Sequence, residues 1–242
     1  MSDNESTSDD EESTDNYSAR QTAVRTLPGE ITRVNESLKD GDDDRSPVMG
    51  ILPSGAAAGR VFVAGAITEV TDVSDEGDDP YYRARLAGPS GPVNIYAGTR
   101  YNEEVANTLV RILDERAYPA EYGVVGKVRT YEADGDTVNA KIDPETMFPL
   151  PSEEVMAFRL NAAARTITRA LEAKDAIEEG TEDDLFEGHN FGVDDLEYSP
   201  DHTDLEDIVR TATETLESVN GSVGDPEADE ADADEADSEA EA

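Results

Sequence analysis

The 242-residue chain contains no cysteine and only two histidines. The lack of cysteine excludes structural disulfides, thiolate zinc sites and thiol catalysis, and two histidines are too few for a histidine-based metal cluster. No stretch approaches the roughly 20 apolar residues of a membrane span, and the N-terminus lacks the basic and apolar regions of a signal peptide. We therefore expect a cytoplasmic protein without metal or cofactor.

Basic residues are also scarce, since 19 Lys and Arg stand against 58 Asp and Glu and give a formal net charge of -39. The acids concentrate in residues 1–16 and 175–242, whereas residues 17–174 are only mildly acidic. A chain this acidic does not attract nucleic acid or an anionic membrane by bulk charge, so any such binding must be local. Many acids with only four lysines are typical of a high-salt archaeal cytoplasm, where molar salt screens charge beyond about 3 Å.

Aromatic content is low at 6%, which favours one compact domain with tails over two domains. Residues 1–17 and 222–242 are acidic and of low complexity, so they are predicted to be disordered. Residues 18–46 are predicted to be a helical segment followed by a linker, although Pro28 and the following glycine should break or kink the helix. The helical spacing comes from Val24, Leu27, Ile31, Val34 and Leu38.

Residues 47–150 predict a mainly β domain, an OB-fold. This fold is a five-stranded Greek-key barrel whose outer face and loops bind oligonucleotides. Five period-two runs separated by turn residues predict the strands: Arg60–Val70, Tyr81–Ala87, Pro92–Ala97, Glu121–Tyr131 and Thr137–Ile142. A helical stripe in Asn102–Arg116 lies between the third and fourth runs, as the element order of this fold requires.

Two flanking helices are predicted after the barrel. Residues 151–180 form a helix with a heptad-like seam, which we predict to bind a partner through Met156, Leu160, Ala163, Ile167, Ala170 and Ile177. Residues 181–221 are an acidic segment with a short amphipathic helix that has no obvious partner in the chain. Phe186, Phe191 and Tyr198 alternate with acids there, which is consistent either with a solvated linker or with a mimic of nucleic acid.

Strand alternation gathers basic residues and tyrosines on the outer face of the barrel. We predict nucleic-acid contacts at Tyr81, Arg83, Arg85, Tyr96, Arg100, Lys127, Arg129, Tyr131 and Lys141. Cations that track phosphates and aromatic rings that stack on bases are what sequence-tolerant single-strand binding needs. Because Arg and Tyr are common outward residues on any antiparallel strand, the pattern alone leaves both interpretations open.

Five segments of the barrel also resemble a known family: Gly59–Val70, Tyr82–Leu86, Gly91–Gly98, Val124–Tyr131 and Ile142–Glu145. The third ends in Tyr-Ala-Gly and the fourth carries Gly-Lys-Val-Arg. They are similar to archaeal proteins associated with replication protein A, whose OB-fold subunit accompanies the main single-stranded DNA-binding subunit in haloarchaea. The resemblance implies a hetero-oligomer that acts in DNA replication and repair, and it does not extend to the acidic region after Gly180.

Catalysis is not expected. The Gly126-Lys127 pair lacks the Ser or Thr and the earlier glycine of a phosphate loop, and His189 and His202 lie in an acidic region without a pocket signal. The predicted function is an OB-fold subunit of a replication protein A-like complex that binds single-stranded DNA with its main subunit. The alternative, which the net charge favours, is a protein-interaction subunit that stabilises or regulates the DNA-binding partner without touching DNA.

Overall fold

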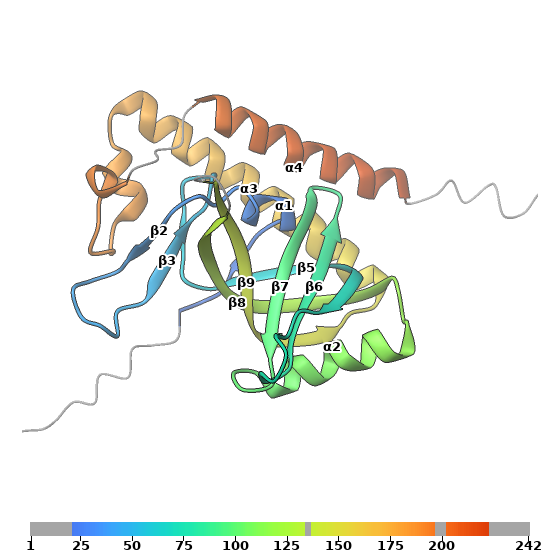
Figure 1. The fold of residues 1–242 in the computed structure, drawn as a ribbon. Helices are drawn as coiled ribbons and strands as arrows, with labels where there is room; N and C mark the ends of the chain where they lie inside the picture. The colour runs from blue at the N-terminus through green and yellow to red at the C-terminus, as the bar shows by residue number, and fades with distance from the viewer. Residues whose placement is uncertain (1–20, 134–136, 197–201, 223–242) are drawn as a thin grey trace, which may run out of the picture.

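The computed structural model describes residues 21–133, 137–196 and 202–222 (Figure 1). Apart from Ser222, the two tails predicted to be disordered lie outside these residues. A β-barrel occupies the centre. Two long helices lie next to each other above the barrel, and a shorter helix lies below it in the view of Figure 1.

The barrel is closed and consists of β5 (Val61–Asp72), β6 (Tyr81–Gly88), β7 (Gly91–Gly98), β8 (Ala120–Ala133) and β9 (Thr137–Pro149). The strand order is β5-β6-β7-β9-β8, and β5 pairs with β8 to close the barrel. Strands β7 and β9 run parallel, whereas the other neighbours in the barrel are antiparallel. Helix α2 (Glu103–Glu115) connects β7 to β8. This order confirms the predicted OB-fold.

Alternating side chains of the strands fill the barrel. Ala84 and Leu86 of β6 and Val124 and Val128 of β8 are buried in one cluster, which also contains the apolar face of α2. Strand alternation predicts inward positions at Ala84 and Leu86, at Val124 and Val128, and at Val138, Ala140 and Ile142. All but Val138 are confirmed. Val138 differs, because it lies near the end of the β8–β9 hairpin and is 38% exposed.

Strand β9 is longer than predicted. The predicted run ends at Ile142, and the next residues are Asp143 and Pro144, of which proline cannot donate to a sheet ladder. The structure continues the strand through a register shift opposite Val125 and Gly126, where an extra residue is accommodated. A Cβ on Gly126 would lie 2.5 Å from the Asp143 carbonyl oxygen, so glycine permits this close approach.

The helix predicted within residues 18–46 is wrong. The segment forms a two-residue strand β1 (Val24–Arg25), a four-residue helix α1 (Pro28–Ile31) and strand β2 (Ser37–Lys39). Pro28 takes the first position of α1, where its missing N–H costs nothing, rather than interrupting a longer helix. The helically spaced Leu27, Ile31 and Val34 are nevertheless buried, because the segment packs against the barrel.

A second, three-stranded sheet lies beside the barrel. It contains β2, β3 (Val48–Ile51) and β4 (Ala57–Ala58), in that order. Strands β2 and β3 pair antiparallel through Ser37–Gly50 and Lys39–Val48. The predicted linker is therefore the loop of a hairpin, and the boundary drawn between residues 46 and 47 falls inside it.

The two long helices cover each other's apolar faces. Helix α3 (Ser152–Glu179) contacts α4 (His202–Ser222) through Ala170 and Ala173 against Leu205 and Ile208. The partner of the second amphipathic helix is thus α3. No described helix has the length and apolar character needed to cross a membrane.

This packing corrects part of the predicted partner-binding seam. Ala163 and Ala170 are buried within the chain, and Ile167 and Ile177 pack against the same intramolecular clusters. These four residues belong to the chain's own core. Met156 is half-buried and Leu160 is 36% exposed, so both retain surface outside that core.

The acidic segment also folds onto the chain. It contains the short 3-10 helices η1 (Glu182–Phe186) and η2 (Val193–Asp195). Phe186 and Phe191 are buried against Met49 and Ile51 of β3, so neither a solvated linker nor a nucleic-acid mimic describes these two side chains. Tyr198 lies outside the described residues.

Asp40 in the β2–β3 loop connects the hairpin to this segment. Its carboxylate accepts hydrogen bonds from the backbone and side-chain amides of Asn190 at 2.7 and 2.9 Å, and it lies 3.0 Å from His189 Nδ1. Burial opposes ionisation, but the hydrogen bonds from His189 and Asn190 outweigh it and lower the pKa of Asp40.

We expect Asp40→Asn to reduce the free energy of unfolding by about 1–2 kcal/mol at neutral pH, because a charged acceptor of several hydrogen bonds is lost. A lowered pKa in the folded state stabilises above the unfolded value of 3.8, and this contribution is lost as pH falls through the folded pKa. The melting temperatures of the two proteins should therefore converge as the pH falls below 3.8 and through the folded pKa of Asp40. A constant difference at all pH values would contradict the role of the Asp40 charge.

Candidate nucleic-acid interface

Three tyrosines and a lysine from four adjacent strands meet on the outer face of the barrel. The rings of Tyr81 on β6 and Tyr96 on β7 stack with centroids 5.9 Å apart and an interplanar angle of 29°. Lys141 Nζ on β9 lies 4.9 Å from the Tyr96 ring centroid and 3.5 Å from the Tyr81 hydroxyl oxygen. Tyr131 on β8 reaches the Tyr96 hydroxyl. We call these four side chains the tyrosine cluster.

The Tyr-Ala-Gly sequence at the end of β7 has a separate structural role at each position. Tyr96 faces outward, whereas Ala97 is buried in the barrel core. Gly98 pairs with Tyr81, and a Cβ on Gly98 would lie 2.8 Å from the Tyr81 ring. Glycine at this position therefore leaves room for the Tyr81 ring to lie against the strand and face Tyr96.

The pKa directions in the cluster follow from its contacts. Partial burial raises the pKa of Tyr131, and the Tyr96 hydroxyl raises it further. Burial favours neutral Lys141, but Asp143 and Tyr81 outweigh that effect and raise the pKa of Lys141. Lys141 is accordingly a cation in contact with an aromatic face, with its charge held in place by a carboxylate.

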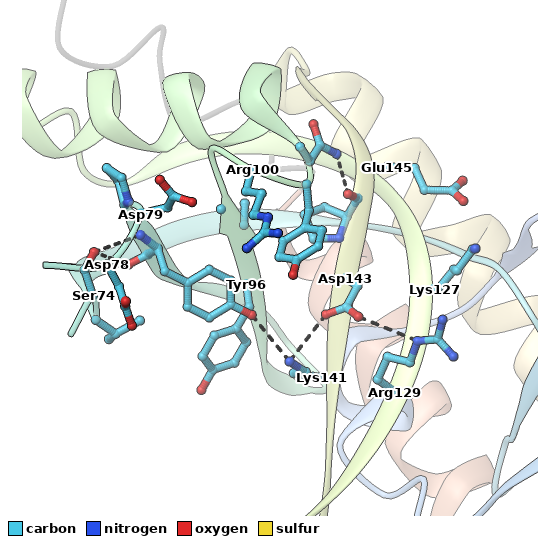
Figure 2. A pocket seen from close by; sticks show the side chains of 18 of the residues that line it. Ser74, Asp78, Asp79, Tyr96, Arg100, Lys127, Arg129, Lys141, Asp143 and Glu145 are labelled. Atoms are coloured by element: carbon cyan, nitrogen blue, oxygen red, sulfur yellow. Dashed lines mark hydrogen bonds and ion pairs between the residues drawn. The ribbon is translucent and has the colours of Figure 1, made fainter.

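The cluster borders an open pocket of about 660 Å³ (Figure 2). Asp143 lies between two cations of this pocket, 3.5 Å from Lys141 Nζ and 3.6 Å from Arg129 Nε. The loop between β5 and β6 contributes three further acids to the lining: Asp75, Asp78 and Asp79. The pocket is therefore close to neutral in charge and differs from the basic groove that would hold phosphates by attraction alone.

The structure brings most of the predicted contact residues together. Six of them line the pocket: Tyr81, Tyr96, Arg100, Lys127, Arg129 and Lys141. Tyr131 joins the group through Tyr96. Arg83 pairs opposite Tyr96 in the β6–β7 ladder and forms an ion pair with Glu69 at 3.2 Å.

Arg85 is not brought to the pocket. It is exposed on β6 and lies opposite Glu69 of β5, away from the end of β6 that carries Tyr81. The acid that pairs with it in the ladder offsets its charge. The predicted DNA contact at Arg85 therefore has the least support from the geometry.

Sequence reasoning missed two residues of this surface. Asp143 follows Asn139 and Lys141 at period two, and the same alternation would have found it if the strand had been extended past Ile142. Tyr101 lies in the turn after β7 and is 84% exposed. No periodic pattern marks it, because the turn belongs to neither a strand nor a helix.

The topology and the outer-face residues define an OB-fold protein whose outer face carries aromatic rings and cations paired with acids. No protein-family model matches the sequence, and no curated protein matches it. Among the described residues, no group of His, Cys, Asp and Glu side chains is placed to hold a metal ion.

Three solved structures that are similar to the chain each cover about two fifths of it. The second single-stranded DNA-binding protein of Mycobacterium smegmatis is 19% identical, with 39% of this chain and 88% of that chain covered and a TM-score of 0.31. A small single-stranded DNA-binding protein of Streptomyces coelicolor is 16% identical, with 39% and 95% covered and a TM-score of 0.28. The OBody AM2EP06, bound to hen egg-white lysozyme, is 18% identical, with 38% and 79% covered and a TM-score of 0.29.

Proposed function

We propose that the barrel binds single-stranded DNA through the tyrosine cluster. The observation that carries this proposal is the meeting of Tyr81, Tyr96, Tyr131 and Lys141 on adjacent strands beside an open pocket. The outer face of the second and third strands of an OB-fold is where oligonucleotides bind, and here these strands are β6 and β7. Aromatic faces stack on any base, so the site requires no particular sequence.

Charge supports binding by stacking rather than by phosphate attraction. Asp143 pairs with both Lys141 and Arg129, and the net charge of the chain is -39. Phosphate contacts weaken as salt rises, with a slope of about -0.7 per contact for single strands. Stacking depends less on salt, so the site suits a cytoplasm at molar salt.

The wider role proposed is that of a subunit in a replication protein A-like complex, in which a main subunit binds single-stranded DNA together with this chain during replication and repair. The Tyr-Ala-Gly and Gly-Lys-Val-Arg motifs of the family resemblance support this role, because they supply Tyr96, Lys127 and Arg129 to the pocket. In this role the protein acts by binding, without catalysis, in a high-salt archaeal cytoplasm. Leu160 and Leu171 of α3, 36% and 50% exposed, offer apolar surface for the partner subunit.

A second function is favoured by the acids around the pocket. Asp75, Asp78 and Asp79 would repel phosphates at low salt, as expected if the chain serves as a protein-interaction subunit and its partner alone touches DNA.

The deciding experiment measures DNA binding by the full chain alone and in complex. Fluorescence anisotropy with a labelled oligothymidylate of about 16 nucleotides in about 2 M KCl should show saturable binding. Co-purification from a salt-loving host, with and without nuclease, should then retain the partner subunit after nuclease treatment. If neither the chain nor its complex contacts the oligonucleotide through this barrel, the protein-interaction function replaces DNA binding.

We expect Asp143→Asn to strengthen DNA binding at low salt, because the change releases both Lys141 and Arg129 from their carboxylate partner. The plot of log affinity against log salt should become steeper by about 0.7 for each cation that then contacts a phosphate. At about 2 M KCl the gain should vanish through screening. Glu214→Gln on α4 removes one charge away from the barrel and should leave the slope unchanged; an equal effect of both variants would assign the change to net charge.

A further inference from the structure

Tyr101 presents an exposed ring on an anchored backbone. The side chain is 84% exposed, whereas its backbone N–H donates to the Gly98 carbonyl at 3.1 Å. The next residue, Asn102, also donates to Gly98 at 2.9 Å and accepts from the backbone of Val105 at the start of α2. The Arg100 guanidinium lies 5.8 Å from the Tyr101 ring centroid. Because the Tyr101 ring stays in solvent, its exposed faces contribute little hydrophobic stabilisation to the fold. The fixed turn holds the ring where a base could stack on it.

Two pockets meet at this turn. Tyr101 lines the pocket beside the tyrosine cluster and also a second pocket of about 680 Å³. The two share four lining residues: Tyr101, Asn102, Pro144 and Glu145. Asn102 donates a side-chain hydrogen bond to the Pro144 carbonyl, which fixes the shared wall. A ligand that follows the surface from Tyr96 past Arg100 therefore reaches Tyr101 and then the second pocket.

The second pocket suits a base rather than a phosphate. Its cation, Arg60, donates to both carboxylate oxygens of Glu145, one of them at 2.7 Å, and also to the backbone carbonyl of Gln21 at 3.0 Å. The hydrogen bond to Glu145 raises the pKa of Arg60 and offsets its charge. Val125 and Pro144 add apolar lining. Besides this ion pair, the lining consists of the Tyr101 ring, the two apolar side chains and the uncharged polar side chains of Asn102 and Thr146. An aromatic ring beside uncharged polar groups favours a flat, uncharged ligand such as a base, whose face stacks and whose edge forms hydrogen bonds.

We propose that Tyr101 and the second pocket form an additional base subsite that extends the path of a single strand from the tyrosine cluster toward Arg60. This inference rests on the proposed function, because it assumes that the cluster holds single-stranded DNA. It assigns to the turn after β7 a base contact separate from the contacts made at Tyr81 and Tyr96. Only a DNA strand long enough to reach from the cluster to the second pocket then occupies the subsite.

The test compares oligothymidylates of about 4 and about 16 nucleotides, the two ends of the range for one OB-fold, on the full chain at about 2 M KCl. We expect Tyr101→Ala to weaken binding of the long strand about tenfold and to leave the short strand within about twofold. Tyr101→Phe, the matched control, keeps the ring and should bind both strands as the unchanged protein does. Tyr96→Ala should weaken both lengths. Because Tyr101 is exposed, the melting midpoint of Tyr101→Ala should not change.

Each other result has a distinct meaning. If neither the unchanged chain nor its complex with the partner subunit binds either strand, the proposed function fails and the subsite with it. If it binds both and Tyr101→Ala binds like the unchanged chain, the subsite is overturned and the proposed function stands. An equal loss for both lengths also overturns a separate subsite, because Tyr101 would then belong to the cluster's own site. Photocrosslinking from a single bromodeoxyuridine, moved along the long strand, should reach Tyr101 and Tyr96 from different positions; crosslinks from one shared position would contradict the proposal.

Discussion

Glu30→Ala is expected to lower the free energy of unfolding by about 3–5 kcal/mol, because it leaves a largely buried arginine without its partner. Glu30 on α1 is 2% exposed, and Arg169 on α3 donates to its two carboxylate oxygens at 3.0 and 3.2 Å. The same carboxylate accepts hydrogen bonds from Thr26, Ser54 and Thr166. The network joins the N-terminal segment, the turn before β4 and α3, so its loss affects the attachment of three segments.

Two matched variants test the cause of this loss. Glu30→Leu combined with Arg169→Leu removes both charges and should recover much of the stability, since apolar replacement of a buried pair is often neutral. Asp207→Asn breaks an exposed ion pair with Arg210 on α4 and should leave the unfolding midpoint unchanged. Urea denaturation followed by circular dichroism in molar KCl measures all three. Equal losses for the single and double Glu30 variants would show that packing, and not the unpaired charge, sets the effect.

The second large effect is expected for DNA binding. Tyr81→Ala combined with Tyr96→Ala should weaken single-strand binding at least about tenfold at about 2 M KCl, because each base stacked on an aromatic ring contributes ~1–3 kcal/mol. Arg83→Ala combined with Arg129→Ala should have a smaller effect at this salt, since phosphate contacts are screened. Fluorescence anisotropy across a salt series measures the affinity of both double variants. The difference between their losses of affinity should shrink or reverse as the salt concentration is lowered.

The double phenylalanine variant of Tyr81 and Tyr96 is the control. It keeps both rings and removes their hydroxyls, including the one that contacts Lys141. Binding close to that of the unchanged protein would assign the affinity to stacking. If neither the tyrosine pair nor the arginine pair changes the affinity at any salt, the barrel does not contact DNA and the chain acts as a protein-interaction subunit.

The barrel was predictable because its signals are local. Alternation marks the inner faces of β6 and β8, and an acidic first turn marks α2. The N-terminal segment was not predictable in this way. Val24 pairs with Val61 of β5, a contact between distant parts of the chain, and this pairing overrode the helical spacing of Leu27, Ile31 and Val34. Spacing correctly indicated which residues are buried, but not the secondary structure that buries them.

The candidate site was likewise predictable only in part. Period two places Tyr81, Tyr96 and Lys141 on one face of the sheet, and register between strands then brings them into contact. Alternation could not reveal that Asp143 pairs with two cations or that Tyr101 remains exposed, because both depend on contacts across the barrel. Likewise, the stripes on α3 and α4 predict two apolar faces without stating that each covers the other.

The parallel junction of β7 and β9 is narrow, since its register rests on the single pair Ile95 and Ile142. Local opening of a barrel should begin where the fewest backbone pairs must break, so we expect it to begin at this junction. Tyr96 projects from one side of the junction and Lys141 from the other, 4.9 Å apart from ring centroid to Nζ. A base stacked on the outer side of this pair would contact both strands, and any opening would then require release of the ligand as well. Occupancy of the outer face would thus slow amide hydrogen exchange in β7 and β9.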